Sequence, residues 1–199
     1  MSIGLWVRGA RPKTLVTSIA SVMVGAVMAY VHIERSGTCI AIYPEPASCA
    51  TAREQQTLLM DRFWPVTILC LLVALFLQIA VNYANDYSDG IRGTDAGRDT
   101  DESKSGKPQR LTASGLVPAK HVLFAAMICA AIACICGVVA VVLAQAWWLL
   151  AVGVASLLAG WFYTGGKHPY GYVGLGEVGV FLFFGLAAVL GTEYALCGT

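Results

Sequence analysis

Charged residues are scarce in this chain of 199 residues. Asp, Glu, Lys and Arg make up 13% of it, against about 25% in soluble domains, whereas 57% of the residues are hydrophobic. This composition excludes an intrinsically disordered chain, and 13 Lys and Arg against 12 Asp and Glu exclude a basic nucleic-acid-binding module. The seven cysteines form no CxxC pair and no other metal-binding pattern. We therefore expect no nucleic-acid partner, and a lipid bilayer as the surrounding medium.

Five stretches are almost free of charge and, at about 20 residues each, long enough to cross a bilayer. Only Gln145 and Ala146 separate the third and fourth stretches, which predicts an antiparallel helical hairpin. The sequence thus predicts an all-α integral membrane protein, with residues 1–199 in one transmembrane domain of about five helices. The five stretches are Thr14–Ile33, Trp64–Ala84, His121–Ala144, Trp147–Thr164 and Tyr172–Leu196.

The distribution of Lys and Arg orients these helices. The N-terminal tail and the segments 85–120 and 165–171 share one side and hold ten of the 13 basic residues, whereas the 34–63 loop holds three. The positive-inside rule places the N terminus and the ten basic residues in the cytoplasm of a multi-pass protein of the cell membrane. Cys39 and Cys49 fall in the loop expected outside, where a disulfide between them is left open as an alternative.

Polar side chains line one face at the end of the second stretch. Asn82, Asn85, Asp86 and Asp89 are spaced i, i+3, i+4 and i+7, so a helix places them on one side. Carboxylates and amides at the edge of the hydrocarbon are unfavourable unless they bind something. Their oxygens suit a hard cation, above all Mg²⁺ shared with substrate phosphates. We predict Asp86, Asp89 and Asn85 as metal ligands, although capping of the helix end is the structural alternative.

The same segment also holds basic residues that suit an anion. Arg110 can contact a phosphate through a bidentate guanidinium, and Lys107 can contact it as a point charge. Carboxylates that bind a cation next to cations that bind an anion predict a diphosphate–metal site.

The fourth loop, WFYTGGKHPYGYVGLGE, is rich in glycine and tyrosine. Tyr163 and Tyr170 can stack on a flat aromatic ring or donate hydrogen bonds to it. Lys167 adds a positive charge, and Glu177 is an acid at the start of a predicted span, a position that is functional by default. A plain interfacial turn is the structural alternative.

Taken together, these motifs resemble the membrane-embedded aromatic prenyltransferase family, which includes the 4-hydroxybenzoate enzymes, and most closely its 1,4-dihydroxy-2-naphthoate branch. The resemblance covers most of the chain outside about 34–63 and 97–107, which look like extra-long loops. It rests on the segments WVRGARPKTLVTSIASVMVGA, NYANDYSDGIRGTD, RLTASG, WFYTGG, PYGYVGLGE and VFLFFGLAAVLGTEY.

By this resemblance the reaction is Mg²⁺-dependent transfer of a polyprenyl group from its diphosphate to 1,4-dihydroxy-2-naphthoate, a small aromatic acid, with formation of demethylmenaquinone in menaquinone biosynthesis. The catalytic residues implied are Asp86, Asp89 and Arg110. The substrate-binding residues implied are Asn82, Asn85, Lys107, Tyr163, Lys167, Tyr170 and Glu177.

The sequence departs from the family at one point. The resemblance implies a nine-helix bundle with a second Asp-rich motif, whereas this sequence contains no Asp after Asp101. We therefore expect a chain truncated at its C terminus that matches about the first five helices and has little activity alone, with a second polypeptide as the partner that could supply the rest. The alternatives are another aromatic acceptor, or a non-catalytic membrane fragment, partner subunit or ion-translocating subunit.

Overall fold

The structure is a computed structural model that describes residues 3–36, 46–93 and 110–198, without the side chains of 46–49. Every regular element among these residues is helical, which confirms the predicted all-α class. In chain order the elements are α1 (Ile3–Gly9), α2 (Pro12–Ser36), α3 (Pro46–Arg92), α5 (Ala119–Ala144), α6 (Leu149–Thr164), the 3₁₀ turn η1 (Tyr170–Val173), α7 (Gly176–Val180), the π-helical segment η2 (Phe181–Ala187) and α8 (Ala188–Cys197).

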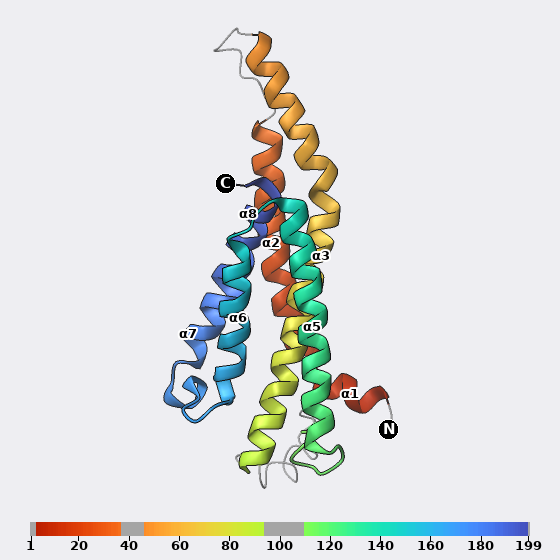
Figure 1. Ribbon diagram of the computed structural model, residues 1–199, viewed down its shortest axis with the longest axis vertical. Helices are drawn as coiled ribbons and strands as arrows, with labels where there is room; N and C mark the ends of the chain where they lie inside the picture. The colour runs from red at the N-terminus through yellow and green to blue at the C-terminus, as the bar shows by residue number, and fades with distance from the viewer. Residues whose placement is uncertain (1–2, 37–45, 94–109, 199) are drawn as a thin grey trace.

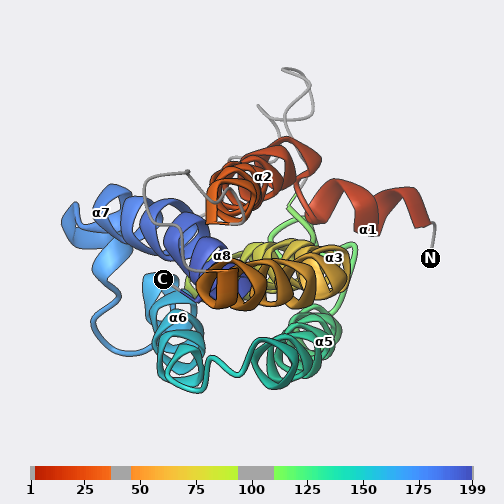
Figure 2. The same cartoon turned by 90° about the horizontal axis from the view of Figure 1, so that it is seen from above.

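The long helices form one bundle around α3 (Figures 1 and 2). Seen from above, α2 lies on one side of α3, α5 and α6 lie on the other, and α7 to α8 close the remaining side. The short helix α1 projects away from the bundle at the end where α3 finishes. The start of α2, the end of α3 and the turn between α6 and α7 therefore lie at the same end of the molecule, as the predicted topology requires.

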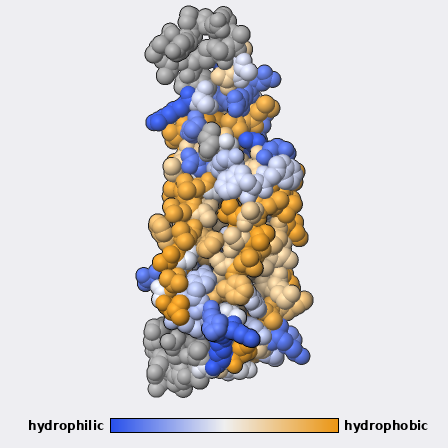
Figure 3. Space-filling model, turned by 60° about the vertical axis from the view of Figure 1, so that its left-hand side comes forward, coloured by the Kyte–Doolittle hydropathy of each residue, from blue (hydrophilic) through white to orange (hydrophobic). Residues whose placement is uncertain are grey.

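Four helices are long and apolar enough to cross a membrane, namely Pro12–Ser36, Ala50–Arg92, Ala119–Ala144 and Gly176–Cys197. The fourth predicted span, Trp147–Thr164, forms α6, an apolar helix of 16 residues. At 1.5 Å per residue it is about 24 Å long, slightly less than the hydrocarbon core of about 30 Å. On the face shown in Figure 3, a broad hydrophobic band crosses the middle of the molecule, and hydrophilic residues gather towards both ends. A surface of this kind is expected for helices that face lipid.

Helix α3 is much longer than the predicted span Trp64–Ala84. Its 47 residues extend for about 70 Å, more than twice the hydrocarbon thickness. The prediction of an extra-long loop over 34–63 is therefore wrong for 34–36 and from Pro46 onward, because these residues are helical. The segment AREQQTLLM consists mostly of strong helix formers and continues directly into the apolar span. Cys49 lies in the first turn of this helix, but its side chain and Cys39 lie outside the described residues, as does the segment 97–107.

The hairpin between α5 and α6 is as tight as predicted. Gln145 adopts a left-handed conformation, with φ of 56°, and its backbone N–H caps the end of α5. Trp148 directly precedes α6, and its ring packs edge-to-face against Tyr194 of α8 at 5.0 Å between centroids. The hairpin therefore contacts the last helix at this end of the bundle.

Buried apolar residues gather towards the two ends of the bundle. One cluster joins α2, α3, the α5–α6 turn and α8, with Ala29, Ile33 and Leu196 fully buried. The other joins Tyr83, Leu111 and neighbouring residues near the end of α3. Between the two, the helices leave room for cavities, which form the candidate site.

Candidate functional site

A cavity of about 270 Å³ lies between α2, α3, α6 and the helix that begins with α7. Its lining is mixed, and we call it the polar cavity because polar groups form a larger part of its wall than in the second cavity described below. Its polar lining combines amides, hydroxyls, phenols and one guanidinium. These residues come from the N-terminal tail, the first turns of α2, the second half of α3, helix α6 and the fourth loop. The polar lining residues are Arg11, Thr14, Thr17, Gln78, Asn82, Asn85, Ser156, Tyr163 and Tyr170.

Asn82 joins α3 to the start of α2. Its amide nitrogen donates to the carbonyl oxygen of Ala10 at 2.8 Å and to the hydroxyl of Thr14 at 2.9 Å. Its carbonyl oxygen accepts a hydrogen bond from Gln78 at 3.2 Å. With these contacts and only 3% exposure, Asn82 fixes the wall of the cavity. Asn85, one turn further on, accepts a hydrogen bond from Thr164 at the end of α6 at 2.8 Å.

Asp86 holds the segment that follows the described end of α3. One carboxylate oxygen accepts the backbone N–H of Leu111 at 2.9 Å, and the other accepts that of Thr112 at 2.8 Å. Asp86 is 2% exposed, and the approach of the segment is so close that a Cβ on Gly90 would lie 2.4 Å from Thr112 Cγ2. Asp86 therefore positions the segment that begins with Arg110, a role that the spacing of the four polar residues did not reveal.

Asp89 lies one turn beyond Asp86 and is partly exposed. The hydroxyl of Tyr172 donates a hydrogen bond to its carboxylate, and Arg92 lies 5.8 Å from the centroid of the same ring. Arg92 also donates a hydrogen bond to the carbonyl oxygen of Gly166. These contacts join the end of α3 to the fourth loop.

The two predicted tyrosines of the fourth loop pack against each other in the cavity wall. The rings of Tyr163 and Tyr170 meet edge-to-face at 5.5 Å, and the Tyr170 hydroxyl donates to the carbonyl oxygen of Ala159 at 3.0 Å. Burial, and then the neighbouring Tyr163, raise the pKa of the Tyr170 phenol above its ordinary value. A Cβ on Gly179 would lie 2.8 Å from the Tyr170 ring, so glycine at this position makes room for it. Tyr170 is thus a rigid, neutral aromatic surface.

Arg11 is the main cavity residue that sequence reasoning missed. It has a left-handed backbone, with φ of 53°, immediately before Pro12 begins α2, and its side chain lines the cavity. One terminal nitrogen of its guanidinium is buried without a hydrogen-bond partner. A buried guanidinium N–H with no acceptor is costly, so an anionic group in the cavity would satisfy it. The Arg-Pro pair at the start of a span is the signal that could have found it.

Gln78 was also missed, although it continues the predicted polar face backward. It lies four residues before Asn82, inside the predicted second span, and lines the cavity. The available signal was its position, because a polar residue four positions before Asn82 lies on the same face of a helix.

Other predicted site residues lie away from the cavity wall. Arg110 is partly buried next to Leu111, at the segment that Asp86 holds. Lys167 and Glu177 are exposed at the same end of the bundle and do not line the cavity. Lys107 lies outside the described residues. Their predicted roles in substrate binding stay predictions.

A second cavity, of about 300 Å³, lies between α2, α3, α5, α6, η2 and α8 and is almost entirely apolar. It shares part of its wall with the polar cavity, where one face of η2 separates the two. The shared lining residues are Leu77, Ser156, Phe183 and Phe184. π-Helical segments are rare and are frequently found at functional sites. The bundle therefore offers a polar compartment next to an apolar one.

Comparisons with known proteins show which sequences this chain is similar to. The chain is 40% identical over 193 residues to the 1,4-dihydroxy-2-naphthoate octaprenyltransferase of Mycobacterium leprae (strain TN) and 42% identical over 193 residues to that of Mycobacterium tuberculosis (strain ATCC 25618 / H37Rv). Each alignment covers 97% of this chain and 54% of the relative. The Escherichia coli (strain K12) protein of the same name is 30% identical over 200 residues, covering 95% of this chain and 52% of its own.

The chain thus spans about half the length of the curated relatives that it matches. No solved structure matches it significantly. The model of the UbiA prenyltransferase family matches residues 57–198, which include the end of α3, the fourth loop and both cavities' shared wall. Because this match covers well over half of the chain, the protein belongs to the UbiA prenyltransferase family.

Proposed function

We propose that this chain takes part in the transfer of a polyprenyl group from polyprenyl diphosphate to 1,4-dihydroxy-2-naphthoate, the step that gives demethylmenaquinone. The observation that carries the proposal is the pair of adjoining cavities, one with a partly polar lining and one almost entirely apolar. A prenyl diphosphate has a strongly anionic head and a long hydrocarbon tail, and the two compartments match these parts. The names of the relatives support the naphthoate as acceptor.

In this proposal the polar cavity receives the diphosphate and the aromatic acid. The unsatisfied N–H of Arg11 donates to an anionic oxygen there, either of the diphosphate or of the acceptor carboxylate. Arg110 and Lys107 approach the diphosphate from the segment that follows α3. The Tyr163–Tyr170 pair contacts the ring of the acceptor, with Lys167 and Glu177 at the rim. The tail lies among the helices in the apolar cavity.

The end of α3 suits Mg²⁺ in its donor chemistry, since Asn85, Asp86 and Asp89 offer only oxygen ligands on adjacent turns. Asp86 is already held by two backbone N–H groups, and the carbonyl oxygen of the buried Asn85 accepts a hydrogen bond from Thr164. We therefore assign the direct contact mainly to the more accessible Asp89, a supporting contact to Asn85, and mainly the positioning of Arg110 to Asp86. Among the described residues no third His, Cys, Asp or Glu joins these two carboxylates in a cluster. Mg²⁺ commonly completes its shell with waters and substrate phosphates. When bound it would supply Lewis-acid stabilisation of the departing diphosphate.

We further propose that the end of the bundle with the polar cavity faces the cytoplasm. The support is the charge distribution, because the N-terminal tail and the sequence segments 85–120 and 165–171 together hold ten of the 13 basic residues. Soluble acceptor and Mg²⁺ would then reach the cavity directly.

The test is binding of a non-hydrolysable polyprenyl diphosphate analogue to the purified chain, with and without Mg²⁺. We expect Mg²⁺-dependent binding that Asp89→Asn weakens by at least about tenfold, because a direct ligand of the metal–diphosphate pair is lost. Asp61→Asn is the matched control, since Asp61 is exposed on the same helix towards its other end. Equal affinity with and without Mg²⁺, or equal loss in both variants, would contradict the proposal and favour a non-catalytic membrane protein.

A further inference from the structure

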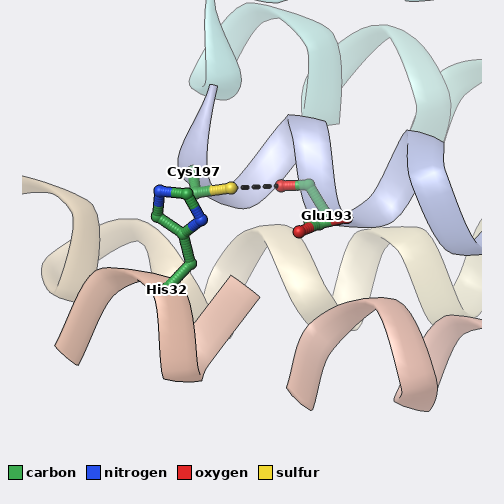
Figure 4. A group of neighbouring side chains, drawn as sticks. All are labelled: His32, Glu193 and Cys197. Carbon is green, nitrogen blue, oxygen red and sulfur yellow. Dashed lines mark hydrogen bonds between the residues drawn. The ribbon is translucent and has the colours of Figure 1, made fainter. Parts of the chain in front are cut away.

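Three side chains with metal-binding atoms converge at the end of the bundle opposite the polar cavity. They are His32 in the last turns of α2 and Glu193 and Cys197 of α8 (Figure 4). Their ligand atoms all lie within 4.8 Å of one another, and no other group of three or more His, Cys, Asp and Glu in the described part of the chain meets this condition. None of the three belongs to the proposed prenyl-transfer site.

The convergence follows from how the two helices pack. Glu193 and Cys197 are four residues apart, so α8 presents both on one face, towards α2. At Gly25 the helices approach so closely that a Cβ would lie 2.3 Å from the backbone oxygen of Val189. Two turns further along α2, Ile33 next to His32 is fully buried in the apolar cluster that contains Cys197. The ligands are therefore carried by a tightly packed pair of helices.

The donor set selects a class of metal. It combines an imidazole nitrogen, a carboxylate oxygen and a thiol sulfur, whereas Mg²⁺ and Ca²⁺ prefer oxygen alone. Zn²⁺ accepts all three types, at about 2.0–2.3 Å. A neutral imidazole with an anionic carboxylate and a thiolate also balances a charge of +2. The Mg²⁺ expected at the other end of the bundle would not compete for this site.

We propose that His32, Glu193 and Cys197 bind a Zn²⁺ ion that ties α2 to α8, with a water molecule in the fourth position. Tetrahedral bonds of that length place donor atoms about 3.4 Å apart, so small side-chain rotations bring the three into range. His32 is exposed and can rotate, which leaves the ion an approach from water. On binding, the Cys197 thiol releases its proton to solvent and gives up its hydrogen bond to the backbone oxygen of Glu193, now 3.1 Å long.

The test uses the full chain in detergent, kept reduced, stripped with a chelator and titrated with Co²⁺ as a spectroscopic substitute for Zn²⁺. We expect one Co²⁺ per chain to give a thiolate-to-cobalt charge-transfer band that added Zn²⁺ removes. Zn²⁺ should also raise the thermal midpoint of the chain in proportion to its affinity. No charge-transfer band in the unmodified chain would overturn the proposal.

Variants identify the ligands. Cys197→Ser should abolish the band, whereas Cys134→Ser should retain it, because Cys134 is an exposed cysteine in the middle of α5. His32→Ala should weaken Zn²⁺ binding by at least about tenfold, whereas His121→Ala, an exposed histidine at the start of α5, should not. A band that survives in Cys197→Ser, or equal affinities in the two histidine variants, would overturn the proposal. His32 is exposed, so its replacement tests the site without disturbing the core.

Discussion

Replacement of Asp86 by Asn should release the segment that follows α3. The carboxylate accepts two backbone N–H groups, at 2.9 and 2.8 Å, and is 2% exposed. The amide of Asn keeps one acceptor oxygen, but it presents an NH₂ group to the second backbone N–H. One charge-assisted hydrogen bond, of about 1.5–3 kcal/mol, is therefore lost in a buried place. Since about 1.4 kcal/mol corresponds to a factor of ten, local opening should become about 10- to 100-fold more frequent.

Amide hydrogen exchange measures this opening directly. The amides of Leu111 and Thr112 should exchange about 10- to 100-fold faster in Asp86→Asn, whereas amides in the middle of α5 should be unchanged. The measurement is made without Mg²⁺, so a metal ligand with no structural role would show no effect. Asp61→Asn, an exposed change on the same helix, is the control. Unchanged protection of both amides in Asp86→Asn would refute the assignment of Asp86 as the anchor of this segment.

Further predictions concern packing, ionisation and the metal. Gly25→Ala should lower the thermal midpoint of the chain in detergent, because overpacking against the backbone of Val189 costs roughly 1–3 kcal/mol. Gly153→Ala is the control and should not lower the midpoint, because a Cβ at Gly153 meets open space. Equal midpoints in the two variants would contradict the close contact at Gly25. Tyr170 should ionise at higher pH than an ordinary tyrosine in an ultraviolet absorbance titration, because burial and then Tyr163 raise its pKa. The fold favours the neutral phenol of Tyr170, so Tyr170 contributes fully to the free energy of unfolding below its unfolded-state pKa, and this contribution is lost as pH rises towards the raised pKa. If the free energy of unfolding above about pH 10 follows the same curve in Tyr170→Phe, this prediction is contradicted. Removal of Mg²⁺ with a chelator should abolish binding of the diphosphate analogue, and retained binding would contradict the role of the metal.

Periodicity and composition were enough to predict most of the architecture. The charge-free stretches correspond to α2, the middle of α3, α5, α6 and the helix Gly176–Cys197. The apolar length that a bilayer demands makes such signals strong. The extension of α3 back to Pro46 was missed because its polar residues were interpreted as a loop between two spans, although their helix propensity is high.

The candidate site was predicted in part. The stripe from Asn82 to Asp89 and the pair Tyr163–Tyr170 do lie at one end of the bundle, and Asn82, Asn85 and both tyrosines share a cavity. Spacing on a helix shows which residues share a face, but it cannot show which long-range partner each one meets. The contact between Asp86 and the backbone of Leu111 joins residues 25 positions apart, and only the packed bundle reveals it. Arg11 was missed for the same reason.

The π-helical segment η2 has a consequence for how this chain tolerates changes in length. In a regular helix such as α5, deletion of one residue rotates everything that follows by about 100° and turns its packed face away from its partners. A π turn already contains an extra residue relative to an α turn. A single deletion within Phe181–Ala187 can therefore be absorbed by conversion to α-helix, while α8 keeps its face towards α2. Single-residue deletions among related sequences should thus concentrate at this wall between the two cavities, where they alter the shape of the cavities and leave the bundle intact.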